Sequence, residues 1–281
     1  MLGPEIIVRS IAQHKFVDRF KNSWQYNPWS DHHSKVACWS VLFDLLLTCE
    51  LLRRHASEKK VGFGINHKMS DFRMDRDKDL DLVICTPGTE SIEGARTFAD
   101  LSDTYKISLS QMELTALKAL PTLIEAPVGS VHLALEAKAT MTAHVKALPR
   151  LYDELNSSHS CIHGASNLAI AAGLSIINGS REFISPKNNL RHVRSKPSVN
   201  SHTQPHATLR TIAKIRQIPR RSTIDERGFD ALAILVVDMR NDGSPVSLIT
   251  EPPAPPAGDI FHYDSMIRRV AQLYEGRFPR A

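Results

Sequence analysis

The sequence predicts an α/β fold, because helical and strand-like segments alternate along the chain. Residues 34–55 repeat apolar side chains at three- and four-residue steps, as one face of a helix does. Residues 80–85 (LDLVIC) and 131–139 (VHLALEAKA) have the length and composition of strands. The apolar run 168–177 (LAIAAGLSII) is typical of a strand that is covered on both faces. A chain of 281 residues is long enough to bury a sizeable core.

The remaining elements follow from the same patterns. We expect a helix over 108–120, a helix over 142–157, strands over 231–239 and 246–250, and a helix over 263–275. The first of these helices opens on serine and glutamate residues arranged as in a capping box. Pro149 predicts a kink or a late start in the helix over 142–157, because proline cannot donate a backbone hydrogen bond.

The distribution of charge divides the chain into three parts. We expect residues 1–184 to form the core with its N-terminal helix, and residues 226–281 to add a C-terminal hairpin and helix that pack on it. Residues 185–225 form a basic insertion without acidic residues before its last position, and this segment is either a solvated loop or a flexible arm for nucleic acid. Its cations include Lys187, Arg191, Arg194, Lys196, Arg210, Lys214, Arg216, Arg220 and Arg221.

The strand over 131–139 holds the residues that suggest chemistry. Side chains alternate along a strand, so His132, Ala134, Glu136 and Lys138 are expected on one face, opposite an apolar face. A carboxylate and an ammonium group would then share one pocket, where the carboxylate binds a divalent cation and the ammonium holds an oxyanion or a nucleophilic water. The alternative is an ordinary salt bridge between Glu136 and Lys138.

The strand over 80–85 supplies a second carboxylate, which a hard cation such as Mg²⁺ needs. Asp81 is the first choice as catalytic residue and metal ligand, because it projects from a rigid strand. Asp79, expected on the same face, is the second choice for the metal.

An aspartate in an LDLV strand, a Glu-x-Lys strand, a helix and an apolar strand together resemble the PD-(D/E)xK nuclease superfamily, which includes many type II restriction enzymes. The resemblance covers about residues 34–184. It implies a restriction-endonuclease-like core with a central mixed sheet flanked by helices, Mg²⁺ as cofactor with Mn²⁺ able to replace it, and DNA cleavage that leaves a 5′ phosphate. Leucine rather than proline precedes Asp81, and the helix after Lys138 lacks a Gln-x-x-x-Tyr motif.

The sequence thus predicts a metal-dependent endodeoxyribonuclease with Asp81, Glu136 and Lys138 at its centre, and we expect it to serve in bacterial restriction or phage defence. The expected partner is double-stranded DNA, and cleavage of both strands favours a homodimer or higher homo-oligomer. Cationic or histidine side chains proposed to contact DNA are His144, Lys146, Arg210, Lys214, Arg216, Arg220 and Arg221. The alternatives are a non-catalytic nucleic-acid-binding or assembly subunit with the same fold, and a nuclease used in repair or as a nucleotide-gated effector.

The first residues and the cysteines bear on the cellular compartment of the protein. Four scattered cysteines form no Cys-x-x-Cys pair, which indicates reduced thiols. The first residues lack the order of a secretion signal, and the apolar run 36–52 is interrupted by Asp44 and Glu50. We therefore expect a cytoplasmic protein without a membrane partner.

Overall fold

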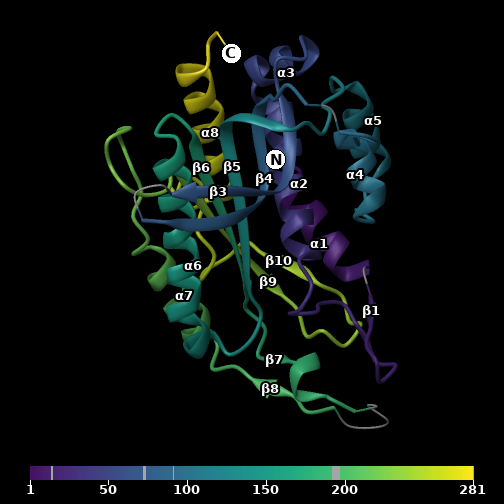
Figure 1. Ribbon diagram of the computed structural model, residues 1–281. Coiled ribbons are helices and arrows are strands. Elements are labelled where there is room, and N and C mark those ends of the chain that lie inside the picture. Colours follow the sequence, from purple (N-terminus) through teal and green to yellow (C-terminus); the bar gives the residue numbers. More distant parts are fainter. Residues whose placement is uncertain (14, 72–73, 91, 192–196, 281) are drawn as a thin grey trace.

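The computed structural model describes residues 1–13, 15–71, 74–90, 92–191 and 197–280. Within them, six strands form one sheet in the order β10-β9-β6-β5-β4-β3 (Figure 1). These strands are β3 (Gly62–Asp71), β4 (Arg76–Pro87), β5 (Val128–Thr140), β6 (Ile170–Asn178), β9 (Ala231–Asp238) and β10 (Ser247–Ile249). Two-residue strands form two further pairs, β1 (Phe16–Val17) with β2 (Ser23–Trp24) and β7 (Glu182–Phe183) with β8 (Asn200–Ser201).

The central sheet is mixed. Strands β3, β4 and β5 are antiparallel neighbours, β6 and β9 run parallel to β5, and β10 pairs with β9 in the antiparallel direction. Every residue of β6 is buried, because β6 lies between two strands and is covered on both faces. The prediction of an α/β fold with a central mixed sheet, and the prediction for β6, are therefore confirmed.

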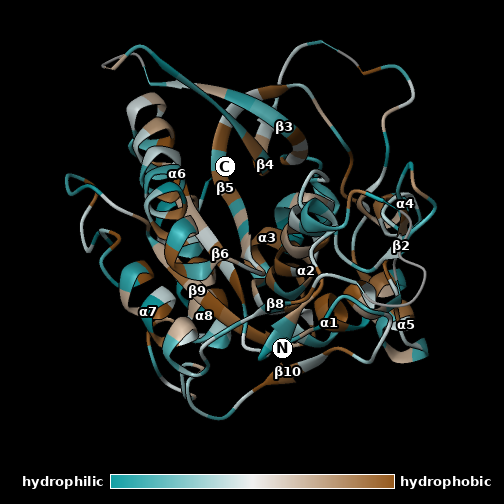
Figure 2. Cartoon of the chain, turned by 90° about the horizontal axis from the view of Figure 1, so that it is seen from below, coloured by the Kyte–Doolittle hydropathy of each residue, from teal (hydrophilic) through white to brown (hydrophobic). Residues whose placement is uncertain are grey.

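Helices cover both faces of the sheet (Figure 1). They are α1 (Gly3–Gln13), α2 (His32–Thr48), α3 (Glu50–Ser57), α4 (Phe98–Thr104), α5 (Gln111–Ala119), α6 (His144–Ala165), α7 (His206–Ile215) and α8 (Tyr263–Arg277), with a short 3₁₀ turn at Pro186–Asn188. The larger apolar cluster joins one sheet face to α1, α2 and α8, and the smaller one joins the other face to α6 and α7. Hydrophobic residues are concentrated in α1, α2 and β9, whereas α6 carries many hydrophilic residues (Figure 2).

Some helix boundaries differ from the sequence prediction. The helix expected over 34–55 is divided into α2 and α3 at Cys49, whose backbone is extended and whose thiol accepts a hydrogen bond from the amide of Leu52. Pro149 lies inside α6, so the late start is not observed. The capping box of α5 is confirmed, because Ser110 and Glu113 exchange backbone and side-chain hydrogen bonds.

The second half of the basic insertion contains α7. Helix α7 buries Thr208, Thr211, Ile212 and Ile215 and packs on α6, because its apolar residues recur on one face. Arg194 and Lys196 lie outside the described residues. Among the described helices, none has both the length and the apolar character needed to cross a membrane.

Candidate active site

The candidate site lies where β4 and β5 separate. Their ladder ends at the pair Leu82 and Leu135, and beyond it the carboxylate of Asp81 accepts a hydrogen bond from the amide of Ala137 (Oδ2 to N, 3.0 Å). On the other side of β4, Asn66 of β3 takes the left-handed conformation with φ 50°. The Asp81 carboxylate, and not a backbone carbonyl of β4, thus accepts the hydrogen bond from the Ala137 amide. This bond holds Asp81 at the opening between β4 and β5.

Asp81 is oriented by two elements. Besides the bond from β5, its Oδ1 accepts a hydrogen bond from the Ser34 hydroxyl on α2 at 2.9 Å. Asp81 and Lys138 both line a cavity of about 320 Å³. Asp79 is exposed, pairs in the ladder with Lys68 and does not line this cavity. Of the two aspartates, the structure therefore brings Asp81 to the other site residues.

Glu136 is 1% exposed, and its charge is balanced by two lysines. Its Oε1 lies 2.8 Å from Nζ of Lys138 and 3.6 Å from Nζ of Lys78, whereas Oε2 is buried and accepts no hydrogen bond from a described residue. Burial and the nearby charge of Asp81 raise the pKa of Glu136 above its ordinary value. A divalent cation at these two carboxylates would relieve that repulsion.

Lys138 stays charged although it is largely enclosed. Burial alone lowers its pKa, but the charges of Glu136 and Asp81 outweigh burial and raise the pKa above the ordinary value. Its Nζ also lies 3.9 Å from Glu154 on α6, and Glu154 is paired with Arg150 at 2.6 Å. A fixed ammonium group therefore stands beside the two carboxylates.

The raised pKa of Glu136 has a consequence for stability. A group whose pKa is higher in the folded state stabilises the fold below its unfolded pKa, about 4.3 for Glu, and loses this contribution as the pH rises through the folded pKa. At neutral pH, Glu136→Gln is therefore expected to melt at a higher temperature than wild type without added metal. The lysines lose less than the carboxylate gains, because Lys78 and Lys138 are partly exposed and Lys138 keeps the nearby charges of Asp81 and Glu154. Thermal unfolding across pH measures this. The difference in melting temperature between Glu136→Gln and wild type should shrink towards pH 4. A lower melting temperature of the variant at neutral pH would show that ionised Glu136 does not destabilise the fold.

His132 does not share the face of Glu136 and Lys138, contrary to the prediction from alternation. The β4–β5 register shifts between Ile84 and Cys85, and the pairing moves from Leu133 to Val131. The His132 ring stacks on Phe278, just beyond α8, with centroids 4.4 Å apart. A β-bulge thus turns this side chain to the opposite face.

Two of the proposed DNA contacts are wrong, because their side chains are buried in other interactions. Arg221 is 3% exposed and donates to both oxygens of Asp230. His144 is 3% exposed, and its Nε2 lies 2.8 Å from the carbonyl oxygen of Asn178. Burial lowers the pKa of His144, so the ring is neutral near neutral pH.

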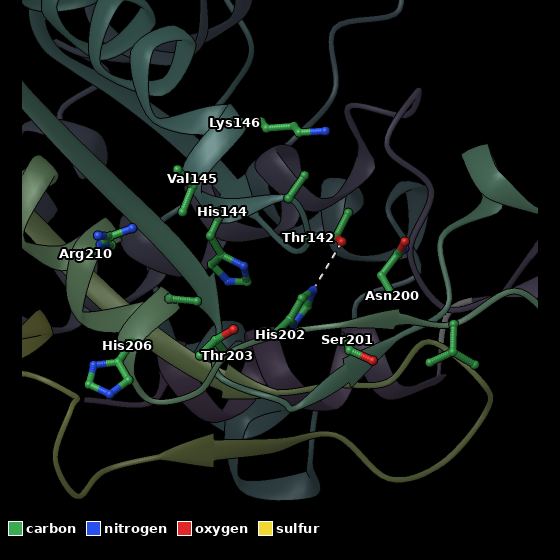
Figure 3. A pocket seen from close by; sticks show the side chains of 13 residues that line it. Thr142, His144, Val145, Lys146, Asn200, Ser201, His202, Thr203, His206 and Arg210 are labelled. Atoms are coloured by element: carbon green, nitrogen blue, oxygen red, sulfur yellow. Dashed lines mark hydrogen bonds between the residues drawn. The ribbon is translucent and has the colours of Figure 1, made fainter.

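The other proposed DNA contacts lie along α6, α7 and the segment after α7. Lys146 and Arg210 are exposed around a second pocket of about 770 Å³ and have no ion-pair partner among the described residues (Figure 3). Lys214 lies over the ring of Tyr152, and Arg216 is paired with Asp259 at 2.6 Å. Lys146 and Arg210 are thus the cations most accessible to a polyanion, whereas Arg220, although exposed, lies over the ring of Phe261.

Several residues at the site were missed by the sequence reasoning. Ser34, Lys78 and Glu154 approach it from α2, β4 and α6, and each is an ordinary polar residue without a local motif. Ser175 stands next to Lys138 in the β5–β6 register, and its buried hydroxyl has no hydrogen-bond partner among the described residues. In the sequence, Ser175 is marked only by being a polar residue inside the apolar run of β6.

Comparison with family models, with curated proteins and with solved structures found no match to this chain. Within the described residues, no group of three or more His, Cys, Asp or Glu side chains is arranged to hold a metal ion. A divalent cation here would instead be held by Asp81 and Glu136 together with water, a mode common for Mg²⁺. The unpartnered Oε2 of Glu136 and the proximity of two carboxylates fit such a cation.

Proposed function

We propose that this chain is a metal-dependent endonuclease that hydrolyses phosphodiester bonds in DNA. One observation carries the proposal: Asp81, Glu136 and Lys138 come together from two strands at the place where the strands separate. A buried carboxylate that keeps an unpartnered oxygen is costly for the fold, and such groups are concentrated at functional sites.

The topology supports the same proposal. Helices α2 and α3 precede the antiparallel strands β3, β4 and β5, and α6 then leads to β6, which is parallel to β5. This order agrees with what the resemblance to PD-(D/E)xK nucleases predicts, with the Glu-x-Lys sequence on β5 directly before α6. We therefore propose a restriction-endonuclease-like core.

The side chains have distinct roles in this proposal. Asp81, fixed by Ser34 and the amide of Ala137, and Glu136 would hold Mg²⁺ or Mn²⁺. When bound, the cation would neutralise phosphate charge and favour ionisation of a water molecule. Lys138 keeps its proton and would orient the attacking water or stabilise the charge that develops on the phosphate oxygens. Because each chain has one such centre, cleavage of both DNA strands would use a homodimer or a higher oligomer.

A second candidate is a non-catalytic nucleic-acid-binding subunit. The observation that favours it is that Glu136 has two cationic partners within the protein, Lys138 and Lys78. In that case, Glu136 and Lys138 would serve the fold alone. The two candidates differ in their response to a divalent cation.

Negatively supercoiled plasmid DNA, in which short stretches of the duplex open, is incubated with the protein and Mg²⁺ to test the choice between them. Wild type is expected to nick or linearise the plasmid with Mg²⁺ or Mn²⁺ and to leave it intact with EDTA. Glu136→Gln should lose the activity and also the rise in melting temperature that Mg²⁺ gives the wild type. Absence of cleavage with either cation, together with no metal-dependent stabilisation, would favour the non-catalytic candidate.

A further inference from the structure

Trp29 stands exposed at the mouth of the active-site cavity. Trp29 is 63% exposed, whereas the other two tryptophans, Trp24 and Trp39, are 4% and 0% exposed. Trp29 lines the same cavity as Asp81 and Lys138. A single exposed apolar residue needs no explanation on an ordinary surface, but a large aromatic face beside reactive groups is a typical ligand contact.

The loop that carries Trp29 is anchored to the fold. The buried side chain of Asn241 accepts hydrogen bonds from the amides of Gln25 and Tyr26 and donates one to the carbonyl oxygen of Tyr26. The amide of Trp29 donates to Oδ1 of Asn27 at 3.0 Å. This side of the cavity is therefore built before a ligand arrives, which reduces the entropy cost of binding.

The cavity mouth combines an aromatic ring with a cation. Arg150 also lines the cavity, and its side chain is 84% exposed while paired with Glu154. Tyr26, in the same loop, and His33 also line the cavity, and their rings stack with centroids 4.9 Å apart. An aromatic face and a guanidinium beside a phosphodiester-cleaving centre match the base and the phosphate of a nucleotide.

We propose that Trp29 stacks on the base of an unpaired nucleotide next to the scissile phosphate, so that the substrate is a single strand or a locally opened duplex. The inference rests on the proposed nuclease function and narrows its substrate. Bases inside an intact duplex are covered on both faces by their neighbours, and Trp29 would have no free face to stack on. The cavity of about 320 Å³ has room for a small ligand.

Tryptophan fluorescence tests the contact without cleavage. Wild-type protein in EDTA is titrated with oligo(dT), with a fully paired duplex, and with the same duplex carrying an internal mismatch bubble. We expect oligo(dT) and the bubble to quench the emission of the exposed Trp29, and the intact duplex to quench it much less. The buried Trp24 and Trp39 should contribute little to the change.

Variants connect the signal to binding, with affinity followed by the anisotropy of a labelled oligonucleotide. Trp29→Ala is expected to weaken oligo(dT) binding about 5- to 150-fold, the equivalent of about 1–3 kcal/mol for one stacked base. Trp29→Phe should retain most of the affinity but lose the quenching. Met112→Ala, which removes another exposed apolar side chain on α5, should bind as wild type does.

The outcomes separate this inference from the proposed function. Equal affinity of Trp29→Ala and wild type for oligo(dT), or an equal response to the intact duplex and the bubble, overturns the stacking role even if the plasmid is cut. Trp29-dependent quenching by oligo(dT) supports it even in a protein that cuts nothing, and would then indicate a non-catalytic single-strand-binding chain. Quenching by the bubble alone assigns the site to opened duplexes, and quenching by oligo(dT) alone assigns it to single strands.

Discussion

Lys138→Ala is expected to reduce Mg²⁺-dependent DNA cleavage by at least about 100-fold, the usual effect of removing one preorganised group that stabilises developing charge. The ammonium group lies 2.8 Å from Glu136 and lines the cavity with Asp81. Alanine leaves the carboxylates in place but removes the only cation that the β5 strand contributes to the site. Initial rates of plasmid nicking at saturating Mg²⁺ measure the effect.

Two matched variants distinguish a catalytic role from a structural one. Lys118→Ala removes an exposed lysine in the last turn of α5 and should cut as wild type does. Lys138→Arg keeps the charge but changes the shape of the donor group, so partial activity is expected. If Lys138→Ala folds, as judged by circular dichroism, and cuts within about threefold of wild type, the assignment of Lys138 to the mechanism is wrong.

Asp230→Asn is expected to destabilise the fold by about 3–5 kcal/mol, because it leaves the buried charge of Arg221 without its counter-ion. Asp230 lies directly before β9. Its carboxylate accepts hydrogen bonds from Arg221, from Arg277 and from the amide of Ala171. Both side chains of the Asp230–Arg221 pair are 0% exposed. Urea unfolding of wild type and variant at neutral pH measures the loss.

The pH dependence provides a second check on this network. Burial opposes the charge of Asp230, but the bonds from His163, Arg221 and Arg277 outweigh it and hold its pKa far below the ordinary range. The stabilisation is therefore present above the unfolded pKa of about 3.9 and is lost as the pH falls towards the folded value. Asp238→Asn, at the exposed end of β9, should change stability by less than about 0.5 kcal/mol. An equally small change in the free energy of unfolding of Asp230→Asn would contradict the conclusion that the bonds to Asp230 stabilise the fold.

Local patterns were sufficient for most of the fold. The apolar run of β6 predicts a buried central strand, and the Ser110–Glu113 arrangement predicts the start of α5, because both depend on neighbouring residues. The break at Cys49 was not predicted, since apolar residues continue through it. Periodicity reports which residues prefer burial, and it does not report where the backbone leaves the helix.

The candidate site was predicted in part for the same reason. Alternation along β5 places Glu136 and Lys138 together, and the structure shows their ion pair. Alternation was wrong for His132, because a bulge changes the face of a side chain without a signature in the sequence. The choice between Asp79 and Asp81 depended on which of them lies at the opening between β4 and β5.

The sequence by itself determined the α/β class, the succession of its main elements and the pairing of a carboxylate with a lysine on one strand, since these follow from local spacing. Tertiary structure alone decided which distant groups join them. Ser34 and Glu154 reach the site from α2 and α6, and Trp29 reaches its mouth from the loop before α2. It also decided that Arg221 is a buried partner of Asp230 rather than a contact for DNA. Whether a charged side chain can reach a ligand depends on which residues pack against it in the fold, and the spacing of charges along the chain does not predict this packing.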